Sequence, residues 1–161
     1  MQFLLNLLER LRRKRIILDR EGKDTYIERY YLLFPQNSHP QWFGFNLLLH
    51  HICQSDPEGL HDHPWGWGSL ILKGGYWEET PEGRFWRKRG SLRFRGATAL
   101  HRLEIDRDRA NGETWTLFFI GHRHREWGFL TESGQWVQWS KHLEGRSSRV
   151  AEKVNGEGDR A

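Results

Sequence analysis

Two histidines at alternate positions, His61 and His63, form the sequence His-Asp-His near the middle of the chain. In a strand, residues two apart point to the same side, so both imidazoles would face one side and Asp62 the other. Neutral imidazole is a common ligand of divalent metal ions. A third ligand must come from another strand, and His101, among small and apolar neighbours, is the candidate. These three histidines predict a site for one divalent metal ion.

The elements that position these histidines are predicted to be strands. Between residues 25 and 139, short segments rich in β-branched and aromatic residues are separated by Gly, Pro, Asn or Asp. Many short strands at close spacing are typical of a sandwich or barrel. The segment SLRFRG alternates regularly, with Leu92 and Phe94 on one face and Arg93 and Arg95 on the other, as a half-buried strand should. We therefore expect an all-β fold.

The spacing around the histidine pair resembles the first sequence motif of the cupin superfamily. That motif has His-x-His, three residues, Glu, six residues and Gly. In this chain, His61 and His63 are followed by Trp67 at the glutamate position and by Gly74 at the glycine position. The frame of the motif is therefore present, although its glutamate is replaced.

The second cupin motif is matched in the same way. It has Gly, five residues, Pro, one residue, Gly, two residues and His, and these positions hold Gly90, Gly96, Thr98 and His101. Fifteen residues separate Gly74 from Gly90, the short insert typical of compact microbial cupins. The two motifs cover roughly residues 55 to 105, and the segments on either side supply the further strands that a cupin barrel requires.

The resemblance implies a cupin jelly-roll barrel, or double-stranded β-helix, in which His61, His63 and His101 hold the metal. Trp67 cannot coordinate an ion, so the carboxylate ligand of most cupins is missing. The remaining set resembles that of the thiol dioxygenases, in which three histidines hold ferrous iron and leave positions open for substrate and oxygen. Iron is therefore the metal we expect in an enzyme, and Zn, Ni, Co and Mn also suit imidazole. Uncharged ligands leave the ion its full charge, which favours a small anionic substrate.

Several alternatives stay open. Three histidines and a water are also a catalytic zinc arrangement, which would favour hydrolysis or hydration. Glu78 or Glu79, after the glycine pair, could supply a fourth ligand. The segments SDPEGLHDHPWGWGSLILKGGYWEE and GHRHREWGF resemble small cupin-like proteins of phages and bacterial genomes, which implies the fold and no particular reaction. The leading alternative to an enzyme is therefore a non-catalytic metal-bound accessory or ligand-binding protein of phage type, whose basic face could contact nucleic acid or a protein partner.

The alternation of side chains along the strands also predicts which residues surround the ion. Trp67 and Ser69 share the face of the histidine pair, and Tyr76 follows on the next strand, so these three are the candidates for a pocket. His50 and His51 end the strand before the first motif, where one of them could orient a metal ligand.

The other reactive side chains are given structural roles. His122 and His124 form a second His-x-His pair, but charged neighbours predict an exposed polar turn. Cys53 lies on the more apolar side of its strand, which predicts a buried, unreactive thiol.

Length and composition set the organisation of the chain. Its 161 residues, of which 37% are hydrophobic, can form one domain with a sizeable core. We divide it into a basic amphipathic helix and linker at 1–24, the barrel at 25–144, and a tail at 145–161 that is expected to be disordered. The helix is expected to dock on the barrel, and the alternative is a helix that lies on a membrane surface or an acidic partner. A single cysteine excludes an intrachain disulfide and fits a cytoplasmic protein without a membrane span.

The distribution of positive charge along the chain indicates which partners to expect. Arg84 to Arg95 is a basic stretch with interleaved aromatic residues, a pattern found in proteins that bind single strands. A net charge of +4 is modest for that role, so nucleic acid is not the expected partner. We expect a small-molecule substrate or ligand, and the resemblance implies a homodimer formed through the outer strands.

Overall fold

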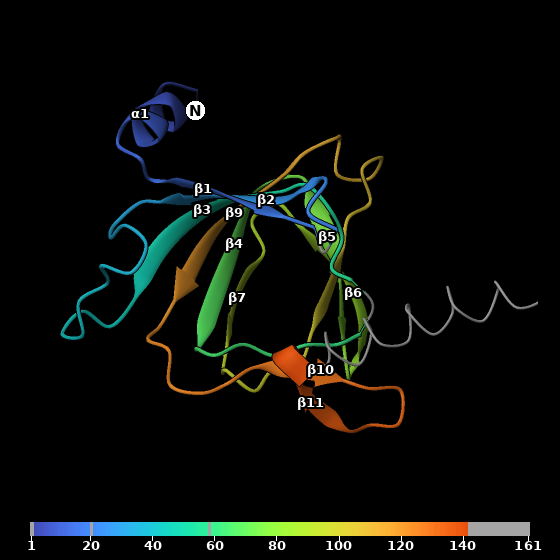
Figure 1. Ribbon diagram of the computed structural model, residues 1–161. Coiled ribbons are helices and arrows are strands. Elements are labelled where there is room, and N and C mark those ends of the chain that lie inside the picture. The colour runs from blue at the N-terminus through green and yellow to red at the C-terminus, as the bar shows by residue number, and fades with distance from the viewer. Residues whose placement is uncertain (1, 20, 58, 142–161) are drawn as a thin grey trace, which may run out of the picture.

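The computed structural model describes residues 2–19, 21–57 and 59–141, which form one helix and eleven strands (Figure 1). The elements are α1 (Gln2–Arg10), β1 (Lys14–Leu18), β2 (Thr25–Tyr31), β3 (Asn46–Ile52), β4 (Trp67–Lys73), β5 (Gly75–Thr80), β6 (Gly83–Lys88), β7 (Leu92–Arg95), β8 (Arg102–Glu104), β9 (Thr114–Ile120), β10 (Gly128–Leu130) and β11 (Trp136–Gln138). The tail predicted at 145–161 lies outside the described residues. None of the described helices is long and apolar enough to cross a membrane.

The strands form antiparallel sheets, as the all-β prediction requires. One sheet has six strands in the order β1-β2-β3-β9-β4-β7, a second has the order β6-β5-β8, and β10 pairs with β11. Figure 1 shows β4 and β7 on one side of the molecule and β5 and β6 on the other, with β10 and β11 across one end. The two larger sheets are therefore the walls of a barrel.

The segment that carries the histidine pair joins β8 to β10. His61 forms isolated bridges with His101 on one side and with Phe129 on the other. Two backbone hydrogen bonds of 2.9 Å connect His61 and His101 reciprocally, and the N–H of Leu130 donates to the carbonyl of Leu60 at 2.8 Å. The backbone thus fixes two of the predicted ligands side by side.

The inner core lies between the two walls. Ile52, Ile71 and Tyr76 form its buried cluster. Partly buried Ile27 from β2 and Leu103 from β8 pack against them. Because β2, β3 and β4 belong to one wall and β5 and β8 to the other, burial of these side chains holds the walls together.

The N-terminal helix packs on the outer face of the six-stranded sheet. Leu5 and Leu8 of α1 are buried against Tyr30, Leu49 and Trp115. Four other apolar residues of this amphipathic segment are exposed: Phe3, Leu4, Leu7 and Leu11.

A strand lies between the helix and residue 25, where the end of the helix and a linker were predicted. Lys14–Leu18 pairs with β2 as the edge strand β1.

Two of the motif glycines occupy positions that require glycine. Gly74 has a φ of 68°, and a Cβ there would lie 2.1 Å from the carbonyl oxygen of Glu113. This residue lets the chain leave β4 in one wall and enter β5 in the other. Gly90 has a φ of 85° in the turn between β6 and β7.

The expected burial of β7 is wrong. Leu92 and Phe94 were predicted to lie on the buried face of this strand, yet 50% and 67% of their surface is exposed. The reason is that β7 is the edge strand of the six-stranded sheet, whereas α1 covers the outer face only around β2, β3 and β9. Alternation fixes which residues share a face, but it does not show which face is covered.

Candidate metal centre

The structure brings the three predicted ligands together. One nitrogen each of His61, His63 and His101 can be chosen so that all three atoms lie within 4.8 Å of one another. The first two come from the segment before β4, and the third directly precedes β8. His101 is buried, whereas His63 keeps part of its surface exposed. The donor set of the cluster is one that divalent transition metals prefer.

The spacing of the ligand nitrogens fits one ion. Nε2 of His63 lies 2.8 Å from Nε2 of His101, so one ring donates a hydrogen bond to the other. Metal–nitrogen bonds of about 2.1 Å require ligand nitrogens about 3.0 to 3.4 Å apart in octahedral or tetrahedral geometry. A small separation of the two rings, with the shared proton moved to Nδ1 of its own ring, would therefore accommodate a metal ion.

The environment of His63 also favours coordination. Burial lowers its pKa well below the usual value, and the nearby His101, His61, Arg29 and His50 lower it further. Its imidazole is therefore uncharged at neutral pH. Because a metal ligand must be deprotonated, this ring loses no bound proton when an ion enters.

A buried carboxylate lies behind His101. Oε1 of Glu78 is 3.5 Å from Nδ1 of His101, and Oε2 accepts a 2.6 Å hydrogen bond from Nε of Arg87. Burial raises the pKa of Glu78, but the contacts with His101 and Arg87 outweigh this and lower it to about 2. The side chain is 1% exposed, so it is an ionised carboxylate held inside the protein.

This placement corrects the idea that Glu78 or Glu79 is a fourth ligand. Glu78 faces Nδ1 of His101, whereas Nε2 of that ring faces His63. Glu79 accepts a 3.0 Å hydrogen bond from Nη1 of Arg102. Neither carboxylate joins the three-histidine group within the described residues. The alternation of side chains along a strand explains why Glu78 points inward, because it lies two residues after Tyr76 on the interior face of β5.

A second carboxylate lies behind His61. Oδ2 of Asp56 is 3.8 Å from Nδ1 of His61 and accepts a 2.7 Å hydrogen bond from the N–H of Leu103, while Oδ1 accepts one from the hydroxyl of Tyr26. Two of the three histidines thus have a carboxylate near Nδ1, which leaves Nε2 for an ion. Such outer carboxylates orient metal ligands and increase their basicity.

Asp62 faces away from the histidines, as the alternation predicts. Its Oδ1 accepts a 2.7 Å hydrogen bond from the N–H of Gly128, and its Oδ2 accepts bonds from Nη1 of Arg125 at 2.6 Å and Nε1 of Trp136 at 2.9 Å. The buried carboxylate therefore ties the ligand segment to β10 and β11.

Trp67 packs directly against two of the ligands. Its ring stacks on His101 with 4.5 Å between centroids and meets His63 edge-on at 5.4 Å. On the other side it stacks on Phe118 at 5.7 Å. The indole therefore replaces the carboxylate of the cupin motif with an apolar surface beside the centre.

The other two pocket candidates are buried near the inner core. Oγ of Ser69 lies 3.5 Å from the hydroxyl of Tyr76, and both residues are buried. Burial raises the pKa of Tyr76 to about 12, so its hydroxyl stays protonated. The ring packs with Ile52 and Ile71.

The two histidines of β3 point to opposite faces. His50 is buried and accepts a 3.0 Å hydrogen bond at Nε2 from Nε of Arg29. His51 stacks on Trp115 at 4.5 Å, and its Nδ1 lies 3.0 Å from Oε2 of Glu28. These contacts show no direct bond from either histidine to a predicted ligand within the described chain. The residues behind the ligands are Asp56 and Glu78 instead.

The second His-x-His pair lies elsewhere. His122 stacks on His39 at 4.1 Å, and its Nε2 is 2.8 Å from the carbonyl oxygen of Phe43. His124 is exposed, with Nδ1 3.1 Å from the carbonyl oxygen of His122. Cys53 is partly buried, and burial raises the pKa of its thiol, which disfavours the reactive thiolate.

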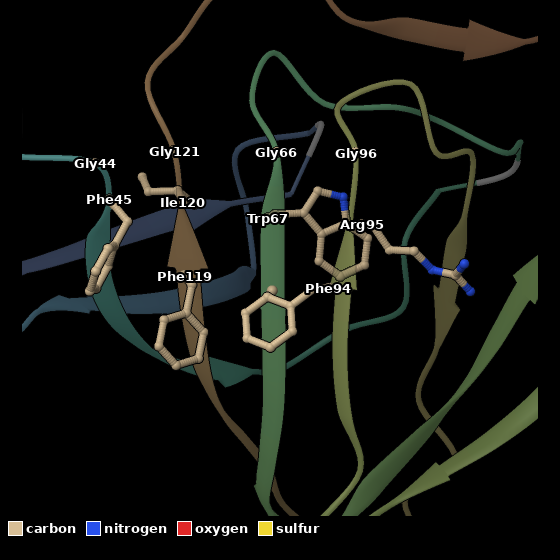
Figure 2. A pocket seen from close by; sticks show the side chains of 11 residues that line it. Gly44, Phe45, Gly66, Trp67, Phe94, Arg95, Gly96, Phe119, Ile120 and Gly121 are labelled. Atoms are coloured by element: carbon tan, nitrogen blue, oxygen red, sulfur yellow. The ribbon is translucent and has the colours of Figure 1, made fainter.

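A separate pocket of about 670 Å³ lies across β3, β9, β4 and β7 (Figure 2). Its aromatic side chains include Phe45, Phe94 and Phe119, and none of the three clustered histidines is among its described lining residues. The register pairs Gly68 with both Phe94 and Phe119, so these side chains share the outer face of the sheet. Trp67 lines this pocket and also packs against the histidines.

Comparisons with known proteins agree on the fold. No family model and no curated protein matches the sequence. A cupin-2 domain protein from Rhodospirillum rubrum has a similar structure, with a TM-score of 0.56 and 13% identity over 75% of this chain and 76% of that chain. A cupin 2 conserved barrel domain protein from Rhodopseudomonas palustris has a TM-score of 0.54 and 14% identity over 75% and 80% of the two chains.

A protein of unknown function with a cupin-like fold from Ralstonia eutropha JMP134 covers more of the chain. Its TM-score is 0.51, with 14% identity over 86% of this chain and 82% of that chain. At such identities the likeness concerns the fold alone. With two facing antiparallel walls and the motif glycines in place, these likenesses show that the chain has the fold of the cupin superfamily.

Proposed function

We propose that the protein is a metal-dependent enzyme that binds one divalent ion, iron in the active form, and performs oxygen-dependent chemistry on a small anionic substrate. His61, His63 and His101 would hold the ion. The observation that carries the proposal is the convergence of their three nitrogens within 4.8 Å, with carboxylates behind two of the rings. A structural histidine requires only hydrogen bonds, whereas three convergent imidazoles are a donor set for a metal.

The surrounding side chains determine what such a centre can bind. When bound, ferrous iron would supply redox chemistry with oxygen and open coordination positions for ligands. Glu78 and Asp56 lie behind the rings of His101 and His61, close to Nδ1, where carboxylates orient metal-binding imidazoles. Trp67 covers one side of the cluster with apolar surface, so no protein carboxylate there reduces the charge of the ion. The centre therefore favours an anionic ligand.

A non-catalytic, metal-bound accessory protein is the second candidate. The observation in its favour is the exposed apolar outer face, where Phe94, Leu92 and Phe45 are 67%, 50% and 41% exposed. Exposed apolar patches are typical of protein–protein contacts. In this reading the outer face contacts a second copy of the chain, and the metal stabilises the barrel.

Metal analysis and oxygen uptake distinguish these functions. Protein purified without oxygen should contain close to one equivalent of iron, and His101→Ala should remove it. His122→Ala is the matched control, because that histidine stacks on His39 outside the cluster. Oxygen consumption with a panel of small thiols and carboxylic acids should then identify a substrate class.

The possible results lead to different conclusions. A stoichiometric zinc content with no oxygen uptake would favour zinc-dependent hydrolysis or hydration. Bound metal without any turnover, together with a dimer in solution, would favour the accessory protein. Wild-type protein that binds no divalent metal under any of these conditions would refute the proposed centre.

A further inference from the structure

Arg29 of β2 faces the interior of the barrel. In the register of β2 and β3, Arg29 lies opposite the buried His50. Ile27, on the same face of β2, packs in the inner core. Nε of Arg29 donates a 3.0 Å hydrogen bond to Nε2 of His50. Arg29 as a residue is half-buried, and its guanidinium lies deep enough for burial to lower its pKa.

The charge of Arg29 has no counter-ion in the described part of the chain. No carboxylate of residues 2–19, 21–57 or 59–141 lies within ion-pair distance of it. His50 does not supply one, since its ring is uncharged: burial and the neighbouring Arg29 lower its pKa well below the usual value. The residue opposite Arg29 on β1 is another cation, Arg15. Like charges directly opposite each other destabilise a sheet, so this pair is not explained by folding.

A comparison with Arg13 shows what an arginine with a structural role looks like here. Nη1 of Arg13 donates to the carbonyl oxygens of Tyr31, Leu32 and Leu33 at 3.0 to 3.4 Å and so holds a chain turn in place. Arg29 instead bonds one uncharged ring and contacts Tyr31. Burial lowers the pKa of Arg29, yet a guanidinium stays protonated in proteins.

A row of stacked rings connects Arg29 with the candidate metal centre. His50 stacks on Phe118 with 4.8 Å between centroids. Phe118 stacks on Trp67 at 5.7 Å, and Trp67 stacks on His101 at 4.5 Å. The cation and the three histidines therefore share one interior.

We propose that Arg29 binds the oxyanion group, carboxylate or phosphate, of a ligand that enters the barrel. His50 holds the guanidinium through Nε, and the remaining N–H donors bind the oxyanion, a geometry that suits bidentate pairing. His50 is thus a positioning residue. The proposal rests on the function given above, since it names the anionic group of that substrate, but the binding of an oxyanion by Arg29 does not itself require a metal.

The test measures oxyanion binding to metal-free and metal-loaded protein at constant ionic strength. Inorganic phosphate and acetate are titrated separately by calorimetry, which distinguishes the two sources of the oxyanion. Wild-type protein should bind one of them in a saturable way, and Arg29→Gln should weaken this binding roughly tenfold or more, since it removes charged hydrogen bonds. Arg29→Lys should retain part of it. Arg89→Gln, at an exposed arginine of the turn before β7, is the matched control and should bind as the wild type does.

The outcomes separate this inference from the proposed metal centre. If Arg29→Gln binds metal normally but not the oxyanion, both proposals stand. If the wild type binds oxyanion through Arg29 but no metal, only the metal centre fails. Equal oxyanion binding by wild type and Arg29→Gln, or no binding of either probe to the wild type in both metal states, overturns the inference. Arg29→Met provides the same comparison if Arg29→Gln does not fold.

Discussion

Oε1 of Glu78 lies 3.5 Å from Nδ1 of His101, on the opposite side of that ring from the 2.8 Å contact between its Nε2 and His63. The carboxylate therefore faces Nδ1 of His101, while Nε2 is directed toward the centre. Outer carboxylates of this kind orient an imidazole and make it a stronger ligand. The same carboxylate is bonded to Arg87, so the ligand is connected to the β5–β6 wall of the barrel.

Replacing Glu78 should weaken metal binding without removing a ligand. We expect Glu78→Gln to lower the affinity for Fe(II) or Zn(II) by about 10- to 100-fold, measured by competition with a chelator. The variant also leaves buried Arg87 without its partner, so its stability should fall by about 3 kcal/mol. Glu79→Gln is the control, because Glu79 bonds Arg102 instead. Equal metal affinity in both variants would contradict a positioning role.

Metal should stabilise the folded barrel. An ion that binds only the folded state at a concentration 100 times its Kd adds about 2.7 kcal/mol to the free energy of unfolding. We therefore expect the melting temperature to rise when metal is added and to return after chelation. His63→Ala should lose this response, whereas His124→Ala, at an exposed histidine, should keep it. A response that survives His63→Ala would place the ion elsewhere.

The buried carboxylate of Asp62 should be important for stability. It accepts hydrogen bonds from Arg125, Trp136 and the backbone of Gly128, and so attaches β10 and β11 to the ligand segment. Asp62→Asn should reduce the free energy of unfolding by about 3 kcal/mol, since it breaks a largely buried ion pair. Urea titration measures this, and Asp108→Asn, at an exposed position, should change little. The effects of Asp62→Asn and Arg125→Ala should not add in the double variant.

Acid should remove a stabilising contribution of Glu28. Burial raises the pKa of this carboxyl, but Lys14 at 2.9 Å and His51 at 3.0 Å outweigh that effect and lower it below the usual value. Its contribution is therefore complete above the unfolded pKa and is lost as pH falls through the lower, folded one. Between pH 6 and 3, the stability of Glu28→Gln should fall less steeply than that of the wild type. Glu21→Gln, in an exposed turn, should follow the wild type, and parallel curves for all three proteins would refute the contribution.

The sequence was sufficient for features that depend on short-range periodicity. Alternation placed His61 and His63 together and turned Asp62 away, and the structure agrees. The predicted strand is reduced to isolated bridges of His61. The resemblance to the cupin motifs singled out Gly74 and Gly90, and both have a positive φ in the structure. Both features are set within a few residues, so no knowledge of the tertiary fold is needed.

Partners from distant strands could not be predicted. Arg125 follows Asp62 by 63 residues, and its role in the barrel depends on where β10 closes. His101 is 23 residues after Glu78, and only the pairing of β5 with β8 brings them together. Burial was also unpredictable at β7, where Phe94 is exposed because nothing in the described chain covers the outer face at that edge.

Replacing Trp67 by glutamate tests how far the indole determines the chemistry of the centre. The ring stacks on His101 at 4.5 Å and meets His63 at 5.4 Å, so a carboxylate at this position lies next to both ligands. In metal-free protein, Trp67→Glu should cost about 3 to 5 kcal/mol of stability, because it removes a buried aromatic ring. With metal present, the carboxylate adds a fourth ligand.

The metal affinity of Trp67→Glu should therefore rise above that of the wild type. Its affinity for anionic ligands should fall, because the carboxylate cancels one unit of the charge of the ion. Trp67→Gln opens a similar cavity without adding a charge, so it separates coordination from packing, and chelator competition measures both variants. If Trp67→Glu and Trp67→Gln bind metal equally, position 67 does not face the ion. The charge of the centre would then have to be controlled from another side of the barrel.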